Sequence, residues 1–297
     1  MTCKRQEPKV SCLVITYNQE NFIRETLDSI LRQDYKNFEI IVSDDGSTDK
    51  TQEILEAYKK NNPDILTVLT QQENVGITKN TNRALVKCTG QYLALIGGDD
   101  IWLPGKLAKQ IQWFQKNNDA SVCYHDVVAF DSKTKRELYL FKDHHRQLVG
   151  GIAEASNGDC FAAACSVMID IGRVPDLIFD EGLPHVSDWF FVLEALIKTN
   201  RKIGYIDGLY AKYRKHSHNI THLKDLRFEF LEGYKILSER YPKYKKELKN
   251  GYSIYYSVIL LNMLKNFKLT SAFKMLLNRS VNFKSLLKCC VRRILKI

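Results

Sequence analysis

Three pairs of polar residues in the first hundred positions could bind a phosphorylated ligand and a cation. The pairs are Thr16-Tyr17, Asp44-Asp45 and Asp99-Asp100, and each follows a short apolar run. Adjacent carboxylates at the end of a buried strand are costly unless a cation or a ligand hydroxyl compensates them. Carboxylates bind Mg²⁺ or Mn²⁺, and Mg²⁺ is usually held by one or two of them together with substrate phosphates.

Both carboxylate pairs also have a purely structural interpretation. Asp99-Asp100 could cap a helix before Pro104 or form an acidic turn, although the preceding Gly97-Gly98 would let backbone or ligand approach closely. Asp44-Asp45, followed by Gly46-Ser47, is by itself typical of a turn that caps a helix. Spacing alone leaves both interpretations open.

The elements that must position these pairs alternate between strand and helix. Apolar and β-branched runs predict strands at residues 10–16, 38–43, 65–69 and 92–96, and helical spacing predicts helices at 20–31, 51–60 and 77–86. This alternation predicts a parallel sheet with helices on both faces. Ligands bind such sheets at the carboxyl ends of the strands, so we expect the three pairs to converge on one crevice.

The order and spacing of these motifs resemble those of family 2 inverting glycosyltransferases. The resemblance rests on residues 10–18, 27–33, 40–49, 74–82 and 90–100; it is good over residues 8–130, thinner to about 222 and absent beyond. It implies the α/β GT-A nucleotide-diphospho-sugar transferase fold, with a mostly parallel central sheet flanked by helices. We expect a nucleotide-sugar-binding half at 1–125, an acceptor-binding and catalytic-base half of the same domain at 126–222, and a basic helical C-terminal extension at 223–297.

The resemblance also implies a donor site at the first two strand ends. Thr16 and Tyr17 match the positions that surround the nucleobase and ribose, and Glu20 lies at the mouth of the same loop. Asp45 matches the carboxylate that hydrogen-bonds a uracil-type base.

The Asp99-Asp100 pair matches the end of the family's DxD-type motif. Asp99 is expected to reach the ribose or the sugar, and Asp100 to coordinate a divalent metal, Mn²⁺ or Mg²⁺, on the diphosphate. Gly97 stands where the family often has Asp, a departure that leaves the metal-binding residue in place. Lys79 is a candidate for the diphosphate or the sugar because Thr81 occupies the place where many relatives have Arg; the alternative is a solvated lysine on a helix face.

Two later segments supply the remaining candidates by resemblance. Asp188 matches an acidic residue that opens a helix and acts as general base, whereas by itself it could simply cap that helix. His216, with Arg214 nearby, matches a histidine that approaches the metal or the diphosphate; a solvated basic loop is the alternative. His125 has no spacing that demands a metal.

The composition favours an ordinary intracellular globular protein. The 297 residues are 44% hydrophobic and 26% charged, which excludes a disordered chain. No stretch reaches the roughly 18 apolar residues of a membrane span, and the first residues lack the apolar core of a signal peptide. The eight cysteines form no metal-type CxxC pair, so we expect a reduced, cytoplasmic protein.

The charge is concentrated at the C-terminal end. Residues 1–222 hold 27 Lys/Arg and 29 Asp/Glu, whereas residues 223–297 hold 17 and 5. Helical patterns are expected at 226–241, 252–267, 272–277 and 285–297. The last is amphipathic and free of carboxylates, as suits an anionic membrane surface; a helix packed on the body with a solvated basic face is the alternative. No motif favours nucleic acid as a partner.

Together these features predict a glycosyltransferase that moves a sugar with inversion from a nucleotide-diphosphate donor, with a UDP-sugar favoured. The acceptor is expected to be a saccharide or lipid-linked molecule at the inner face of the cytoplasmic membrane, as in bacterial surface-polysaccharide assembly. One alternative is a nucleotidyltransferase, which typically has a Gly-rich basic loop where this chain has residues 16–20. The other is a non-catalytic membrane-associated scaffold, in which Asp100 and Asp188 could be replaced without consequence.

Overall fold

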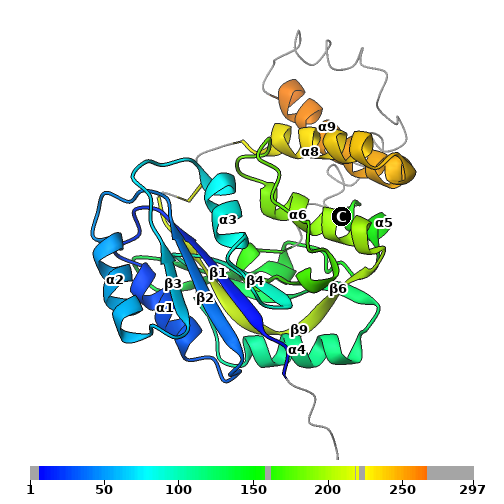
Figure 1. Ribbon diagram of the computed structural model, residues 1–297. Helices are drawn as coiled ribbons and strands as arrows, with labels where there is room; N and C mark the ends of the chain where they lie inside the picture. Colours follow the sequence, from blue (N-terminus) through cyan, green and yellow to red (C-terminus); the bar gives the residue numbers. More distant parts are fainter. Residues whose placement is uncertain (1–6, 158–161, 218, 221–224, 266–297) are drawn as a thin grey trace, which may run out of the picture.

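The computed structural model describes residues 7–157, 162–217, 219–220 and 225–265. Within them a curved, nine-stranded sheet carries helices on both faces (Figure 1). The strand order is β3-β2-β1-β4-β8-β6-β9-β5, and β7 pairs with the last residues of β6, beyond those that pair with β8. The α/β architecture predicted from the sequence is therefore confirmed.

The first half of the sheet is parallel, and its strands end at the same level. Thr16 at the end of β1 pairs with Asp44 at the end of β2, and Ile15 pairs with Gly97 of β4. These strands are β1 (Val10–Thr16), β2 (Phe38–Asp44), β3 (Leu66–Leu69) and β4 (Tyr92–Gly97). The helices between them are α1 (Ile23–Leu31), α2 (Thr51–Asn61) and α3 (Ile77–Leu85), close to the ranges that the hydrophobic spacing predicts.

Beyond β4 the sheet becomes mixed. β8 is antiparallel to both β4 and β6, whereas β6 is parallel to β9 over almost its whole length. The chain leaves β4 through Asp99 and Asp100 and enters a two-residue strand, β5, that pairs with β9. The elements are β5 (Ile101–Trp102), α4 (Lys106–Lys116), β6 (Ala120–Asp131), β7 (Glu137–Leu140), η1 (Phe141–Asp143), α5 (Ile152–Ala155), η2 (Ala164–Ser166), β8 (Met168–Asp170), η3 (Ile171–Arg173), α6 (Ser187–Thr199) and β9 (Lys202–Lys215).

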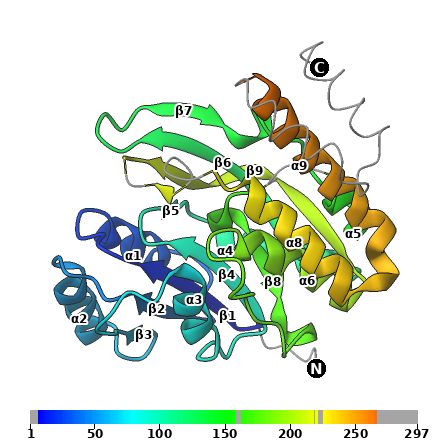
Figure 2. The ribbon, with the colours of Figure 1, turned by 90° about the horizontal axis from the view of Figure 1, so that it is seen from above.

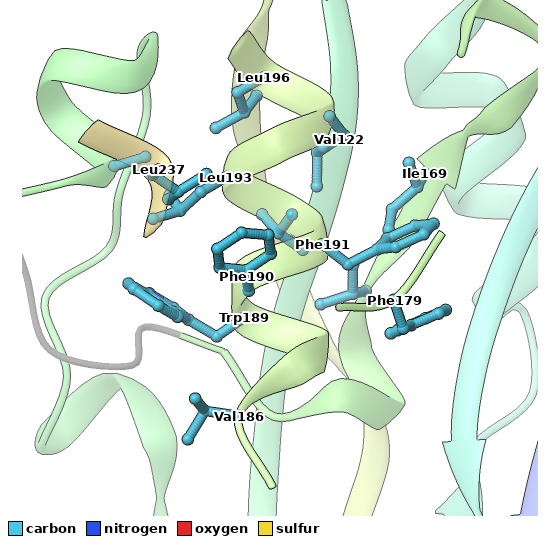
Figure 3. Packing of buried hydrophobic residues seen from close by; sticks show 14 of the residues in the cluster. Val122, Ile169, Phe179, Val186, Trp189, Phe190, Phe191, Leu193, Leu196 and Leu237 are labelled. Carbon is cyan, nitrogen blue, oxygen red and sulfur yellow. The ribbon is translucent and has the colours of Figure 1, made fainter. Parts of the chain in front are cut away.

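Two hydrophobic cores fill the two faces of the sheet. One lies between the sheet and α1, α2 and α4, with residues such as Cys12, Leu27 and Leu107. The other lies under α6, a helix whose side chains are nearly all buried. In this core the ring of Phe191 from α6 stacks on the ring of Phe179 (Figure 3). α6 is apolar all round because it is covered on both sides, by the sheet and by the last helices.

The C-terminal helices form a hairpin that packs on α6. They are α8 (Arg227–Arg240) and α9 (Lys245–Lys265), with η4 (Pro242–Tyr244) between them (Figure 2). The ring of Trp189 in α6 meets Phe230 and Tyr234 of α8 edge to face, with ring centroids 4.9 Å apart in both pairs. α8 and α9 therefore pack on the body of the protein. The expected helices at 272–277 and 285–297 lie outside the described residues, so the two interpretations of the last helix stay predictions. Among the residues described, no helix is both long and apolar enough to cross a bilayer.

Candidate functional site

The ends of β1, β2 and β4 lie side by side at one edge of the sheet. The backbone N–H of Asp45 donates to the Thr16 carbonyl, and that of Gly98 donates to the Ile15 carbonyl, both at 2.9 Å. A Cβ at Gly98 would lie 2.9 Å from the Thr16 Cβ and even closer to the amide oxygen of Gln19. A glycine is therefore required for the β4 turn to approach β1, and the three polar pairs lie at one edge of the sheet.

Asp45 is buried and holds the turn that precedes α3. Its carboxylate accepts hydrogen bonds from the backbone N–H groups of Val75 and Gly76, both at 3.0 Å, and from the Gln71 amide. Ionised carboxylates offer about four acceptor positions, so one remains for a ligand. Tyr17 lies at the same edge of the sheet, with 44% of its surface exposed.

Asp44 and Glu20 have structural partners at the start of α2. Asp44 accepts hydrogen bonds from the Ser47 backbone N–H at 3.0 Å and from the Gln52 amide at 2.8 Å, so it stabilises the turn. Glu20 accepts from the backbone N–H of Lys50 at 2.9 Å, which fastens the loop after β1 to the α2 N-terminus. The turn-and-cap interpretation of the first carboxylate pair therefore applies to Asp44, while Asp45 faces the α3 turn.

α3 begins beside Asp45 and carries two cations. Lys79 is exposed in its first turn. Arg83 reaches back under the strand ends, where Nη2 donates to the Asp44 carbonyl at 2.9 Å and Nη1 donates to the Thr70 carbonyl at 2.9 Å. From the sequence, Thr81 occupies the place where many relatives have Arg, and Lys79 is the candidate cation. Arg83, two positions after Thr81 on the same helix, is not identified there.

Asp99, Asp100 and His216 meet where β4 and β9 end. The imidazole Nε2 of His216 lies 2.9 Å from Asp99 Oδ2, and Asp100 Oδ1 accepts the backbone N–H of Arg214 at 2.9 Å. Burial, and then the neighbouring charge of Asp99, raises the pKa of Asp100 well above its ordinary value. A cation at this point would relieve both effects.

Arg214 is a fully buried cation that ties this corner together. Its Nε donates to the Asp99 carbonyl and its Nη2 to a Glu25 carboxylate oxygen, both at 2.5 Å. The guanidinium lies between the rings of Phe22 and Phe130, 4.8 and 4.7 Å from their centroids. Arginine suits this place because its planar group can stack on rings and donate in two directions at once.

The side chains at this corner fit a divalent cation that a ligand helps to hold. Asp99, Asp100 and His216 offer carboxylate and imidazole donors, which suit Mn²⁺, and the carboxylates suit Mg²⁺. Among the residues described, no three His, Cys, Asp or Glu side chains are already gathered as a metal cage. Phosphate oxygens would therefore have to complete the coordination.

Asp188 lies in the first turn of α6, and its carboxylate accepts the backbone N–H of Trp189 at 2.7 Å. Burial, and then the charge of Glu229, raises its pKa. The hydrogen bond from the Trp189 backbone lowers the pKa, so burial outweighs it here. A carboxylate whose pKa moves toward neutrality is better matched to removing a proton from a hydroxyl.

Glu229 of α8 fastens the chain that leads into α6. One carboxylate oxygen accepts the backbone N–H groups of His185 at 2.6 Å and Val186 at 2.9 Å, and the other lies 2.9 Å from His185 Nδ1. These are donors at a helix entry that need a partner from outside the helix. The C-terminal hairpin therefore fixes the segment that carries Asp188. No local sequence pattern at residue 229 predicts this contact.

Asp188 and Asp100 both lie close to the η2 turn. Asp188 lines an open, largely apolar pocket together with Ala164, Leu95 of β4 and others. Cys165 follows Ala164 in the chain, and its thiol lies against the Asp100 carboxylate. Burial, and then the charge of Asp100, raises the pKa of this thiol. The candidate base and the candidate metal ligand thus both neighbour residues of η2.

The sequence model described as "Glycosyl transferase family 2" matches residues 11–169. An uncharacterized protein of Mycobacterium tuberculosis is 32% identical over 216 residues, which cover 72% of this chain and 60% of the relative. The chain therefore spans about 60% of the length of this relative and of its Mycobacterium bovis counterpart. EpsE of Bacillus subtilis, named as a glycosyltransferase, is 36% identical over 124 residues, 42% of this chain and 45% of the relative.

Two solved structures share the fold. TarS of S. aureus in complex with UDP-GlcNAc has a TM-score of 0.62 and 23% identity, covering 77% of this chain and 65% of TarS. The mannosyltransferase PcManGT from Pyrobaculum calidifontis, in complex with GDP-Man and Mn²⁺, has a TM-score of 0.62 and 17% identity, covering 97% and 88%. At these identities the likeness establishes the fold alone, and the expected GT-A fold is confirmed.

Proposed function

Because the chain belongs to glycosyl transferase family 2, we propose that it transfers a sugar from a nucleotide-diphosphate donor to an acceptor hydroxyl with inversion. The observation that carries this proposal is that the candidate metal-binding carboxylate and the candidate base both neighbour η2. Asp99 and Asp100 lie at the end of β4, and Asp188 lines the neighbouring pocket. Inverting transfer needs both a place for the leaving diphosphate and a base on the acceptor side.

The donor would lie along the strand ends. Thr16 and Tyr17 border the nucleoside, Glu20 holds the loop that carries them, and Asp45 offers its remaining acceptor position to a uracil-type base. Lys79 lies exposed at the start of α3, where its charge would face the diphosphate or sugar. A UDP-sugar is favoured, and the TarS structure with UDP-GlcNAc supports a donor of this class.

Asp99 would reach the ribose or sugar, while Asp100 and His216 would hold the divalent cation. The cation would neutralise charge that develops on the departing diphosphate. PcManGT was solved with Mn²⁺, which supports this assignment. Arg214 would keep Asp99 and Asp100 in place through its contacts to the Asp99 carbonyl and to Asp100 Oδ1.

Asp188 would accept the proton of the attacking hydroxyl. As the acceptor oxygen bonds to the anomeric carbon, the bond from that carbon to the phosphate oxygen breaks, and the diphosphate leaves with the electron pair. The raised pKa of Asp188, caused by burial, makes the carboxylate a stronger base than an exposed aspartate.

The acceptor proposed here is a saccharide or a lipid-linked molecule at the inner face of the cytoplasmic membrane. TuaG of Bacillus subtilis, named for teichuronic acid biosynthesis, is 36% identical over 114 residues, which supports a surface-polysaccharide setting. Phe228 and Leu264 are exposed large apolar residues of α8 and α9, and the basic residues 266–297 follow Leu264 in the chain. An anionic lipid surface would attract that segment and accept the apolar pair.

Donor binding tests the proposal. The shift in Tm should be measured with UDP, GDP, dTDP and CMP, each with and without Mn²⁺. We expect one nucleoside diphosphate, UDP in the first place, to raise Tm only with Mn²⁺, because a ligand that binds the folded state alone stabilises it. Asp100→Ala should abolish the shift, and Asp64→Ala, a change at an exposed aspartate outside the site, should keep it.

Failure of every nucleotide to raise Tm would favour the non-catalytic scaffold. Product analysis separates the second alternative. Glycosyl transfer releases a nucleoside diphosphate from a nucleotide sugar, whereas a nucleotidyltransferase consumes a nucleoside triphosphate and releases pyrophosphate.

A further inference from the structure

α3 contacts the segment that leads into α6 and Asp188. Thr78, the second residue of α3, is buried, with 3% of its surface exposed. Its hydroxyl oxygen lies 2.8 Å from the Leu183 carbonyl oxygen and 3.0 Å from the Ser187 hydroxyl oxygen. Ser187 directly precedes Asp188. One side chain of α3 is therefore bonded to two residues that lie 105 and 109 positions later in the chain.

The direction of these two hydrogen bonds follows from their chemistry. A hydroxyl has one proton and a carbonyl oxygen can only accept, so Thr78 donates to Leu183. In the second bond the Ser187 hydroxyl is then the donor and Thr78 Oγ1 the acceptor. Ser187 is also buried, with 3% of its surface exposed. Removing the Thr78 hydroxyl would leave both partners unpaired and buried, so the segment would have to move for them to reach water.

A second contact fixes the other end of this segment. Asn82 lies one turn after Thr78 on the same face of α3. Its Nδ2 donates to the Phe179 carbonyl at 2.9 Å, and its Oδ1 accepts the Phe179 backbone N–H at 2.8 Å. Two bonds of opposite direction determine both the place and the orientation of this backbone. Residues 179–187 are therefore held to α3 at both ends, while Glu229 of α8 binds the backbone between them.

The start of α3 also takes part in the candidate donor site. The backbone N–H of Gly76, which immediately precedes α3, donates to Asp45, and Lys79 follows Thr78. The turn that binds Asp45 and the hydroxyl that binds Ser187 are therefore parts of one helical turn. A displacement of about 1 Å in a catalytic group can reduce a rate about 100-fold. The distance between donor and base therefore has to be fixed, and α3 provides a short link between them.

We propose that Thr78 and Asn82 are positioning residues, which hold residues 179–187 against α3 and thereby fix Asp188 relative to the donor-binding turn. This inference rests on the proposed transferase function. It gives α3 two roles, since the same helix would present Lys79 to the donor and hold the catalytic base in place. Thr78 and Asn82 act through the segment that they hold, and not on the substrate itself.

The test measures the pKa of Asp188 in the full chain by ¹³C NMR of the aspartate side-chain carboxyls, with Asp188→Asn used to assign its signal. Burial raises this pKa, so the pKa reports how closely the surrounding chain covers the carboxylate. Thr78→Val keeps the shape of the side chain and removes the hydroxyl. In this variant we expect the pKa of Asp188 to fall toward the ordinary value of an aspartate. Thr78→Ser, which keeps the hydroxyl, should restore the original pKa.

Thr81→Val is the matched control on the same helix. Thr81 is also buried, with 4% of its surface exposed, but its hydroxyl donates at 2.7 Å to the carbonyl of Ile77 within α3. Both valine variants lose a buried hydrogen bond and can lower Tm, whereas only Thr78→Val should change the pKa of Asp188. Asn82→Ala releases the other end of the segment. It should lower the same pKa, and it takes the place of Thr78→Val if that variant does not fold.

Two results would overturn the positioning role. One is an Asp188 pKa that stays unchanged or rises in both Thr78→Val and Asn82→Ala, and the other is an equal fall in Thr81→Val. UDP with Mn²⁺ should raise the Tm of Thr78→Val as much as that of the unmodified chain, because the turn at Asp45 is kept. Loss of this response in Thr78→Val would assign Thr78 to the donor site and also overturn the proposal.

The positioning role and the transferase proposal fail separately. If UDP raises the Tm of the unmodified chain and the pKa of Asp188 does not move, the positioning role is wrong and the transferase proposal stands. If the pKa falls as expected and no nucleotide raises Tm, the contact between α3 and the Asp188 segment stands and the transferase proposal is wrong.

Discussion

Asp188 is placed where its ionised form costs stability. Its pKa is raised by burial, so the folded protein holds this proton more tightly than the unfolded chain does. The charged carboxylate therefore lowers stability in full above its folded-state pKa, and that cost disappears as the pH falls from this pKa to the lower pKa of the unfolded chain. A group kept at a cost to stability is typical of a catalytic site.

We accordingly expect Asp188→Asn to reduce transfer by about 10²–10⁴-fold, the usual contribution of a general base, while Tm stays the same or rises. Transfer should be followed by nucleoside diphosphate release, and Tm by thermal unfolding at pH 7. Asp176→Asn, at an exposed aspartate, is the matched control. Near-normal transfer by Asp188→Asn would remove this residue from the mechanism.

Arg214 is expected to be irreplaceable even by lysine. Lysine cannot reach the Asp99 carbonyl and Glu25 together, nor stack between Phe22 and Phe130 as a planar group does. Arg214→Lys should lower the free energy of unfolding by about 1–3 kcal/mol. Urea unfolding would measure this, with Arg136→Lys at an exposed arginine as control; equal stabilities of the two variants would contradict the assignment.

At the scale of elements, the contact between α8 and the start of α6 connects the C-terminal hairpin to the catalytic base. Glu229 binds the backbone of His185 and Val186, and its charge adds to the raised pKa of Asp188. Replacing Glu229 by glutamine keeps an acceptor oxygen for the backbone and removes the charge.

The expected consequence is a lower pKa of Asp188 in Glu229→Gln. Transfer falls at acidic pH as the base becomes protonated, so the acidic limb of kcat/KM should move to lower pH in this variant. Glu232→Gln on the same helix is the control, since Glu232 is exposed and pairs with Lys235. A limb that stays in place, or moves to higher pH, would show that α8 does not tune the base.

At the scale of the whole molecule, the helical hairpin completes the core and is more than an appendage. α6 is covered by α8, and Trp189, Phe230 and Tyr234 share one cluster of rings. A chain ending at residue 225 would expose this surface, and we expect it to aggregate or to fail to fold.

A chain ending at residue 265 keeps both helices and should retain its Tm and UDP binding. It lacks residues 266–297, which carry eight Lys/Arg and no Asp/Glu. We expect it to lose binding to vesicles that contain phosphatidylglycerol, measured by co-sedimentation against neutral vesicles and the full chain. Undiminished vesicle binding would place the membrane contact elsewhere, and a folded chain ending at residue 225 would show that the hairpin is dispensable.

Much of the N-terminal half is predictable from the sequence, for a local reason. Strand and helix periodicities depend on residues that are close together in the sequence. β1 accordingly lies at the residues that its apolar run predicts. Parallel strands of similar length end at one edge, so Thr16, Asp45 and Asp99 had to lie near one another once the alternation was recognised.

What only the tertiary structure decided are contacts between residues far apart in the chain. Arg214 binds the Asp99 carbonyl across 115 positions, and Glu229 binds His185 across 44. Leu95 of β4 and Asp188 of α6 come to line one pocket although 93 positions separate them. Local periodicity does not determine which distant strand or helix will cover a residue. The sequence alone therefore determined only the framework of the donor site. Packing determined how its candidate base is held in place.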